Sequence, residues 1–169
     1  MKISMIVAMD EGGIIGNSKD LPWRIPSDLA RFKSLTEGDG FNSVIMGRKT
    51  WDSLPSSFRP LPNRVNIVLS RDSSWKEDGA ESALYAGRAI EISFAEGCEE
   101  CWIIGGAQIY EMFLDLVEEI HITRVHTSDS GDVSFPEWES NDWQEEVIEE
   151  VSSDQEDDFA TTYSIWKRA

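Results

Sequence analysis

Short apolar runs alternate with segments of helical periodicity over the first two thirds of the chain. Nearly continuous apolar runs, typical of strands buried on both faces, lie at 3–8, 43–46, 65–70 and 101–104. Segments with helical spacing of apolar residues lie at 26–36, 48–54, 88–95 and 107–116. Strands that alternate with helices predict a parallel sheet with helices on its faces, and we expect one more strand at 83–86.

The last third of the chain has a different pattern. Residues 119–125 alternate apolar and polar side chains, and 161–166 form a second β-rich run. The acidic stretch 144–151 fits either a helix or a strand. Strands that follow one another without a helix predict an antiparallel addition at the sheet edge. The sequence has no repeat, low-complexity segment or linker, so we expect 1–169 to form one domain.

The chain is strongly acidic, with 32 Asp and Glu residues against 15 Lys and Arg and a net charge of −17. Binding of nucleic acid needs a basic patch, and the sequence has none; 137–158 contains no Lys or Arg at all. The charge favours solubility by self-repulsion, as in halophilic proteins, so a salt-loving source is one hypothesis. The longest apolar runs, 5–9 and 65–69, are too short to cross a bilayer, and the N-terminus lacks a signal-peptide pattern. We expect a cytoplasmic protein with no membrane partner.

The cysteines and histidines receive no functional role from the sequence. Cys98 and Cys101 form a lone C-x-x-C, whereas zinc would need two more ligands. A thioredoxin-like pair opens a helix, but this pair leads into an apolar run, so two packed or exposed thiols are expected. His121 and His126 fall on opposite faces of an expected strand, and neither has an evident partner nearby in sequence. We expect no metal site.

Asp28 is the first candidate for chemistry. Ser27 is expected to cap a helix whose apolar positions include Leu29, Phe32 and Leu35. Asp28 precedes Phe32 by four residues and therefore shares its inward-facing stripe. Two interpretations remain open: an aspartate that stabilises the first helical turn, or a carboxylate in an apolar cleft that binds a ring edge and assists proton transfer.

Three strand ends carry groups suited to anions. They are Met46-Gly47-Arg48-Lys49-Thr50, Ile104-Gly105-Gly106-Ala107 and Leu69-Ser70-Arg71. Glycines allow close approach of a ligand, and backbone N–H groups at a helix start, cations and hydroxyls bind phosphate. None has the spacing of a Walker A or Rossmann motif, so each alone is equally an ordinary turn. Two such strand-to-helix junctions in one sheet favour a dinucleotide, and Ser70 with Arg71 suits a 2′-phosphate.

Together these segments resemble dihydrofolate reductases over nearly the whole chain. The resemblance rests on Ile6-Val7-Ala8, Ile15-Gly16, Leu21-Pro22-Trp23, Pro26-Ser27-Asp28-Leu29, Phe32-Lys33, 44–51, 59–64, Ile103-Ile104-Gly105-Gly106, Thr123, and Gly131-Asp132 before Phe135-Pro136. It implies an α/β fold with a mostly parallel eight-stranded sheet, an antiparallel C-terminal strand and about four flanking helices. It also implies reduction of 7,8-dihydrofolate to tetrahydrofolate by hydride transfer from NADPH to pterin C6, which supplies one-carbon metabolism and thymidylate synthesis.

The resemblance also implies roles for individual residues. The catalytic residues would be Asp28, which assists protonation at N5, together with Trp23 and Leu21. Residues implied to bind substrate are Ile6, Val7, Ala8, Asp28, Leu29, Phe32, Arg59, Arg64, Ile104, Tyr110 and Thr123. Within that set, Arg64 would pair with the α-carboxylate of the glutamate tail, and Arg59 would flank the tail.

The implied cofactor contacts lie at the glycine junctions and in the loop before Asp28. They are Ala8, Ile15, Gly16, Leu21, Gly47, Arg48, Lys49, Thr50, Leu69, Ser70, Arg71, Ile104, Gly105, Gly106, Ala107, Gln108, Ile109 and Tyr110. The Gly105–Gly106 peptide bond is expected to be cis, as in the family. Residues 16–24 resemble the family's mobile loop, which closes over nicotinamide beside Gly131 and Asp132.

The family leads us to expect a monomer that binds dihydrofolate and antifolates such as trimethoprim or methotrexate. The nearest rival is a pyrimidine reductase of riboflavin synthesis, against which Asp28 and Arg64 in their motifs argue. A non-catalytic binding module that kept the nucleotide sites is an alternative of another class. An enzyme that is active only at high salt is a third possibility.

Overall fold

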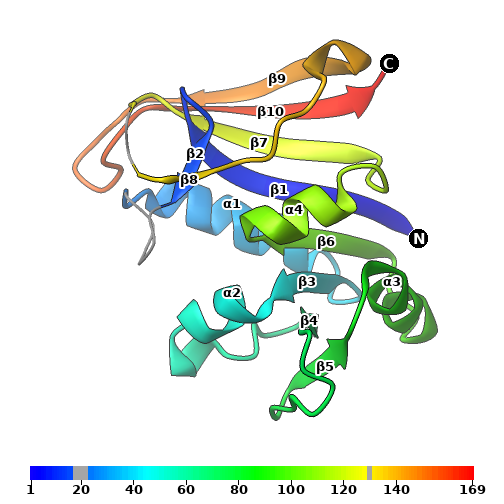
Figure 1. The fold of residues 1–169 in the computed structure, drawn as a ribbon. Helices are drawn as coiled ribbons and strands as arrows, with labels where there is room; N and C mark the ends of the chain where they lie inside the picture. The colour runs from blue at the N-terminus through cyan, green and yellow to red at the C-terminus, as the bar shows by residue number, and fades with distance from the viewer. Residues whose placement is uncertain (17–22, 129–130) are drawn as a thin grey trace.

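The computed structural model describes residues 1–16, 23–128 and 131–169, and its main feature is an eight-stranded sheet. The strand order is β5-β4-β3-β6-β1-β7-β10-β9 (Figure 1). These strands are β1 (Lys2–Asp10), β3 (Ser43–Gly47), β4 (Val65–Leu69), β5 (Ala80–Ala83), β6 (Glu100–Gly105), β7 (Glu119–Val125), β9 (Trp143–Val151) and β10 (Thr161–Arg168). The strands β5, β4, β3, β6, β1 and β7, in this spatial order, are all parallel. The strand β10 runs antiparallel to both of its neighbours, β7 and β9. This confirms the mostly parallel sheet with an antiparallel C-terminal strand.

Helices cover both faces of the sheet. They are α1 (Pro26–Glu37), α2 (Arg48–Ser53), α3 (Ala86–Ala95) and α4 (Ala107–Phe113), with short 3-10 turns at Ser56–Phe58 and Ser140–Asp142. Phe32 of α1 and Trp51 of α2 pack with Val44 and Met46 of β3. On the other face, α3 and α4 pack against Met5, Val7 and Met9 of β1. In Figure 1, α4 lies in front of the sheet and α1 behind it.

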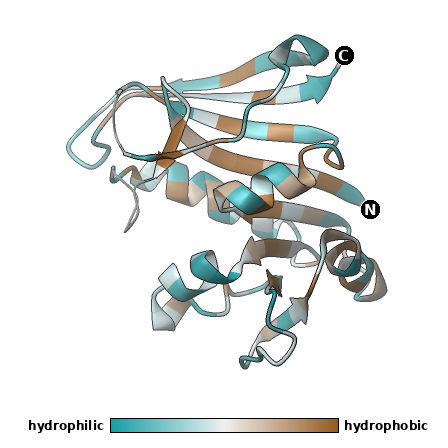
Figure 2. Ribbon diagram, viewed as in Figure 1, coloured by the Kyte–Doolittle hydropathy of each residue, from teal (hydrophilic) through white to brown (hydrophobic). Residues whose placement is uncertain are grey.

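The central strands are hydrophobic because both of their faces are covered. Ile45, Ile67 and Ile103 are fully buried, and Val44 and Val68 are buried on the opposite face. Figure 2 shows β1 and β3 as largely hydrophobic and β9 as mostly hydrophilic. Continuous apolar runs in the sequence therefore marked the middle of the sheet correctly.

Three details differ from the sequence-based expectation. The strand expected at 83–86 lies at Ala80–Ala83, and Ala86 already begins α3. The ambiguous acidic stretch is the edge strand β9. A two-stranded sheet of β2 (Ile14–Gly16) and β8 (Val133–Ser134) was not anticipated. All three elements are short or exposed at an edge, where hydrophobic periodicity is weak.

The start of α1 also differs from expectation, because Ser27 does not cap the helix. The N-cap residue is Ile25, and Pro26 occupies the first turn, where a missing N–H costs nothing. The Ser27 N–H donates instead to the Asp157 carboxylate at 3.1 Å, and the Ser27 hydroxyl donates to the same carboxylate. A residue 130 positions away thus satisfies the helix start.

Both cysteines are free and buried. The Ser93 hydroxyl lies 3.6 Å from the Cys101 sulfur, and burial raises the pKa of both thiols. Of the two cases that the sequence left open, packed or exposed thiols, the structure shows packed ones. No helix in the described ranges is long and apolar enough to span a membrane.

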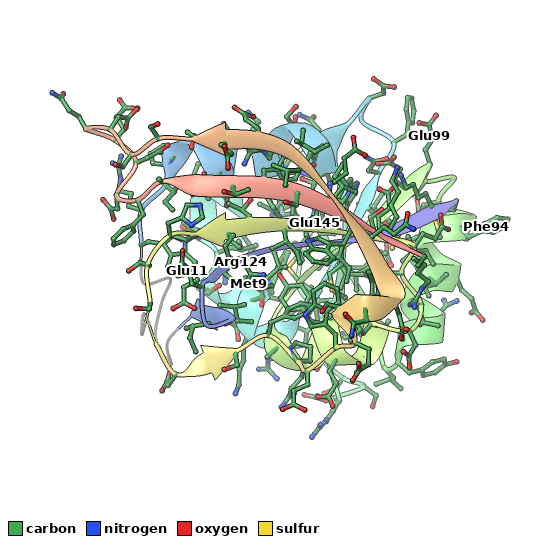
Figure 3. The ribbon with its side chains drawn as sticks, turned by 90° about the horizontal axis from the view of Figure 1, so that it is seen from above. Met9, Glu11, Phe94, Glu99, Arg124 and Glu145 are labelled. Carbon is green, nitrogen blue, oxygen red and sulfur yellow. The ribbon has the colours of Figure 1, made fainter. Side chains whose placement is uncertain are left out.

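The acidic surface gives a testable prediction about salt. Glu145, Glu146 and Glu150 are exposed on β9 (Glu145 is labelled in Figure 3), and salt screens repulsion between such charges. We expect the melting temperature to rise between 0.05 and 1 M KCl, since about 1 kcal/mol of relieved repulsion adds about 2–4 °C for a chain of this length. Calorimetry measures this, and the triple variant Glu145→Gln, Glu146→Gln, Glu150→Gln should show a smaller rise. A melting temperature that is independent of KCl would contradict the halophile hypothesis.

Candidate active site

The parallel strands bring their carboxyl ends to one edge of the sheet. In the register, Gly47 lies opposite Leu69, Met46 opposite Gly105, and Ala8 opposite Thr123. Figure 3 shows this end of β1 and β7 near Glu11 and Arg124, with Phe94 and Glu99 at the opposite end of the molecule. The sequence-predicted site residues on five different strands therefore share one edge, which is where open α/β sheets bind ligands.

Asp28 lies at this edge, on the first turn of α1. Its Oδ1 accepts a hydrogen bond from the Thr123 hydroxyl of β7 at 2.6 Å. The guanidinium of Arg31 lies 3.5 Å from the same oxygen. Only 22% of the Asp28 side chain is exposed, so the carboxylate faces the protein rather than solvent.

Burial raises the pKa of Asp28 above its ordinary value. The Thr123 hydrogen bond and the positive charge of Arg31 act in the opposite direction, and Asp157 adds a smaller upward effect. A partly desolvated carboxylate with a raised pKa is suited to proton transfer. Asp28 is thus a partly buried carboxylate and also a residue of the first turn of α1.

The walls around Asp28 are largely apolar. Ile6, Phe32 and Ile104 are half-buried and pack on the cluster that contains Trp51 and Trp102. Ala8 packs on a smaller cluster. These side chains lie on the Asp28 side of the sheet and leave part of their surface open.

Two expected substrate contacts have side chains in other positions. The Val7 side chain points to the opposite face, where it packs with Met5 and Met9, so only its backbone lies toward Asp28. Leu29 is 57% exposed, so its side chain faces largely toward solvent.

Tyr110 of α4 joins the ends of two strands. Its hydroxyl lies 2.8 Å from the Ile6 carbonyl oxygen and 3.0 Å from that of Ile104. Burial raises the Tyr110 pKa, and the nearby Asp28 charge raises it further. Tyr110 is therefore a neutral donor that fixes the backbone between Asp28 and the glycine junctions.

The segment before Asp28 is only partly described. Trp23 is buried with Ile25 and Val125 and packs beside Ala8, and Ile15 packs on the large core cluster. Gly16 ends β2. Leu21 and most of the expected mobile loop lie outside the described residues.

Arg64 lies against the C-terminal end of α1, where its side chain is almost completely buried. Its side chain is 3% exposed, with Nη2 3.6 Å from the Glu37 carboxylate. Nε donates to the Pro62 carbonyl oxygen at 2.9 Å and Nη1 to the Thr36 hydroxyl at 2.9 Å. Burial lowers the Arg64 pKa, which the Glu37 charge partly offsets. The half-exposed Arg59 lies 5.9 Å from the ring centre of Trp51.

The two glycine junctions lie side by side. A Cβ on Gly47 would meet Ile109 at 3.0 Å, and one on Gly106 would meet the Thr50 hydroxyl at 3.8 Å. Gly105 has a φ of 120°, a conformation that favours glycine, and its peptide bond to Gly106 is cis. The glycines thus allow the ends of β3 and β6 to pack closely against residues of α2 and α4.

Polar groups surround these junctions. Arg48 and Lys49 are exposed on α2, with Arg48 3.8 Å from Asp52. Ser70 follows β4 and accepts from the Asp72 N–H at 3.2 Å, and Arg71 beside it is exposed. Of the other expected contacts on α4, Ile109 is buried, Ala107 is half-buried and Gln108 is exposed.

A buried network near Asp28 is not apparent from the sequence pattern. The expectation that His121 lacks a partner nearby in sequence was wrong, because its Nε2 lies 3.0 Å from Glu119; its Nδ1 lies 2.6 Å from the Tyr163 hydroxyl. Glu119, two residues earlier on the same strand face, was an available signal. The pairing with Tyr163 depends on how β7 and β10 align, which single-strand patterns do not give. Arg31, three residues after Asp28, was also missed.

Comparisons with known proteins agree with this geometry. A family model described as dihydrofolate reductase matches residues 2–168. A dihydrofolate reductase of Staphylococcus haemolyticus is 39% identical over 170 residues, which cover 99% of this chain and 96% of that protein. One of Neisseria gonorrhoeae is 43% identical over 145 residues, covering 86% and 85%. The solved dihydrofolate reductase from Enterococcus faecalis, complexed with NADP(H) and RAB-propyl, has a TM-score of 0.83 and 29% identity, covering 99% of this chain and 96% of that one.

These similarities define the chain as an NADPH-dependent oxidoreductase. More specifically, it belongs to the dihydrofolate reductase family.

Proposed function

We propose that this protein reduces 7,8-dihydrofolate to 5,6,7,8-tetrahydrofolate. The observation that carries the proposal is the partly buried Asp28 carboxylate, hydrogen-bonded to Thr123 at 2.6 Å, among apolar side chains at the edge that also bears the glycine junctions. Such a carboxylate can bind the N3 and 2-amino groups of a pterin, which form a donor pair matched to its two oxygens. The apolar walls at Ile6, Phe32 and Ile104 suit the flat faces of the ring.

The residues around the glycine junctions fit a phosphorylated dinucleotide. The lack of a Cβ at Gly47, Gly105 and Gly106 lets the strand ends pack closely against Ile109, Tyr110 and Thr50, and the backbone of Gly47 and Gly106 is half-buried. Thr50, Ser70 and the exposed cations of Arg48, Lys49 and Arg71 form a group of phosphate-binding donors, although the chain as a whole is acidic. When bound there, NADPH supplies the hydride that the pterin ring accepts at C6.

The protein's own contribution is alignment, exclusion of water and control of a proton. Asp28 fixes the ring orientation and assists protonation at N5, while Thr123 holds Oδ1 in place. Tyr110 holds the strand ends at Ile6 and Ile104, between the two binding regions. Trp23 and Leu21 would close the nicotinamide side, and Arg64 with Arg59 would bind the glutamate tail.

We also propose that 1–169 acts as a single catalytic domain, monomeric and cytoplasmic, without a nucleic-acid partner. It would supply tetrahydrofolate for one-carbon metabolism and thymidylate synthesis. Antifolates such as trimethoprim or methotrexate would compete at Asp28, since a diaminopyrimidine ring protonated at N1 offers a matching pair of donors, N1–H and the 2-amino group.

The primary test follows NADPH absorbance at 340 nm with dihydrofolate, at low and high KCl. Oxidation that requires dihydrofolate and is blocked by an antifolate supports the proposal. Turnover only at high KCl would add salt dependence to it. A folded protein that oxidises no NADPH at any salt concentration would contradict it, and an aminopyrimidine ribityl phosphate would then be the next substrate to try.

The choice of NADPH over NADH gives a further prediction. Arg71→Gln removes an exposed cation beside Ser70, and a hydrogen bond to a charged group contributes about 1.5–3 kcal/mol. We expect KM for NADPH to rise about tenfold, with KM for NADH nearly unchanged. Arg88→Gln removes the same charge from α3 and should change neither. Equal effects of Arg71→Gln on both cofactors would contradict a 2′-phosphate contact.

A further inference from the structure

Arg31 is a nearly buried cation beside Asp28 to which the family resemblance gives no role. Its side chain is 13% exposed, although arginine on a helix is normally solvated. Three groups surround its guanidinium: the Asp28 carboxylate at 3.5 Å, the Glu149 carboxylate at 3.0 Å and the Tyr163 ring, whose centre is 4.4 Å away.

The guanidinium is held on two sides by parts of the chain that are distant in sequence. Arg31 Nη2 donates to Glu149 of β9, 118 residues away. The flat guanidinium lies over the Tyr163 ring of β10, a cation–π geometry. Nη1, which lies nearest to Asp28, has no hydrogen-bond partner among the described residues. One face and Nη2 are thus held, and Nη1 lies 3.5 Å from the Asp28 carboxylate.

The Tyr163 ring is itself fixed by the buried network on β7. Its hydroxyl lies 2.6 Å from His121 Nδ1, and His121 Nε2 lies 3.0 Å from Glu119. Burial lowers the pKa of His121 despite Glu119, so the neutral ring donates from Nε2 to Glu119 and accepts from Tyr163 at Nδ1. Lys2 closes the network 2.9 Å from Glu119. The Tyr163 ring, on which the Arg31 guanidinium packs, is therefore held in one orientation.

We propose that Arg31 is a positioning residue for Asp28: the guanidinium, fixed between Tyr163 and Glu149, keeps the Asp28 carboxylate ionised and oriented for the proposed binding of the pterin. This deepens the proposed function and rests on it. An opposite charge at this distance favours the charged form of a carboxyl, and arginine does not lose its own proton in the process.

The other charged and titratable groups around Asp28 do not replace Arg31. Thr123 of β7 stabilises the carboxylate by a hydrogen bond, whereas the buried Asp157, which binds Ser27, opposes its ionisation. The hydroxyls of Tyr110 and Tyr163 are neutral, because burial raises the pKa of Tyr110 and raises that of Tyr163 to about 12. Arg31 is the cation whose charge offsets the burial of Asp28.

The test measures the Asp28 carboxyl directly, without substrate. Protein labelled with ¹³C at the aspartate carboxyl carbons is titrated by NMR, and Asp28→Asn identifies the signal. In Arg31→Gln we expect the midpoint of the Asp28 titration to move upward by about one pH unit or more. Arg31→Lys keeps the charge without the planar stack and should give an intermediate shift.

Two further variants test the sign of the charge effect on the Asp28 midpoint and provide a control at a distant site. Glu149→Gln keeps an acceptor for Arg31 but removes a negative charge, so the Asp28 midpoint should fall slightly, since Glu149 is 58% exposed. Arg88→Gln removes an equal charge from α3, where the side chain is 53% exposed, and should leave the midpoint unchanged.

The pH profile of kcat/KM for dihydrofolate is the second readout, because it reports the pKa values of groups in the free enzyme. We expect the profile of Arg31→Gln to move in the same direction as the NMR midpoint. An unchanged NMR midpoint in both Arg31→Gln and Arg31→Lys would overturn the proposal, as would a shifted midpoint with an unshifted profile. Absence of turnover in the unmodified protein would instead count against the proposed function, while the NMR titration would still test Arg31.

Discussion

Asp28→Asn is expected to lower kcat for dihydrofolate reduction by about 10²–10⁴-fold near neutral pH, the contribution typical of a positioned acid or base. Asparagine has nearly the same shape and keeps an oxygen that can accept from Thr123. The loss therefore comes from the missing carboxylate rather than from a cavity. Steady-state kinetics across pH would measure it, and the deficit should narrow as pH falls, because solvent can then protonate N5 directly.

NADPH binding separates a catalytic role of Asp28 from a structural one. The glycine junctions and their polar groups belong to β3, β4, β6, α2 and α4, whereas Asp28 belongs to α1. We expect Kd for NADPH, measured by tryptophan fluorescence, to change less than twofold, which corresponds to less than about 0.5 kcal/mol. A loss of NADPH affinity as large as the loss of turnover would show that Asp28 maintains the fold. Thr123→Val, which keeps the carboxylate and removes its hydrogen bond, should give a smaller loss of turnover.

The sequence could predict the sheet because its central strands are buried on both faces. Continuous runs such as those around Ile45, Ile67 and Ile103 are needed where helices cover the sheet on each side. The strand-to-helix junctions followed from the glycines at their ends. The sequence could therefore predict the position of residues that is set only by the strand or helix turn to which they belong.

The edge elements were less predictable, for a physical reason. β9 has only one neighbouring strand, and most of its residues are exposed on both faces. Because neither face is buried, the apolar residues of such a segment need not recur every two residues, as in a strand, or every 3.6 residues, as in a helix. Helix and strand therefore fit its pattern equally well. β5, at the other edge, also has a mixed burial pattern, and its expected position was wrong by three residues.

Contacts between distant segments account for what was missed in the site. The i,i+3 spacing of Asp28 and Arg31 is visible in the sequence, but the two groups that fix Arg31 come from β9 and β10. Likewise, Ser27 does not cap α1 as expected, because its N–H and hydroxyl both donate to the distant Asp157 carboxylate. The family resemblance marked Asp28 and Thr123, but it gave no information on Arg31, whose position depends on contacts with Glu149 of β9 and Tyr163 of β10.

Arg64→Leu is expected to raise KM and Kd for dihydrofolate roughly 30-fold, about 2 kcal/mol, with a smaller effect on kcat. The guanidinium would bind the tail carboxylate, which lies far from the reacting atoms, so its loss weakens the ground state and the transition state alike. Equilibrium titration with dihydrofolate measures the change, and dihydropteroate, which lacks the glutamate, is the matched control ligand. Its affinity should be almost unaffected; equal weakening of both ligands would mean that Arg64 only supports the fold.

Glu37 provides a second test of the assignment of Arg64, because its carboxylate oxygen already lies 3.6 Å from Arg64 Nη2. A tail carboxylate would approach a guanidinium that is 3% exposed and partly neutralised, so Glu37 and the substrate compete for the same charge. Glu37→Gln removes the competing charge while keeping a polar side chain, and it should tighten dihydrofolate binding about 2–5-fold, or roughly 0.5–1 kcal/mol. Dihydropteroate binding should again stay the same. Opposite effects of Arg64→Leu and Glu37→Gln on dihydrofolate alone would assign the tail carboxylate to Arg64, whereas weaker dihydrofolate binding in Glu37→Gln would show that Glu37 supports Arg64 instead of competing for it.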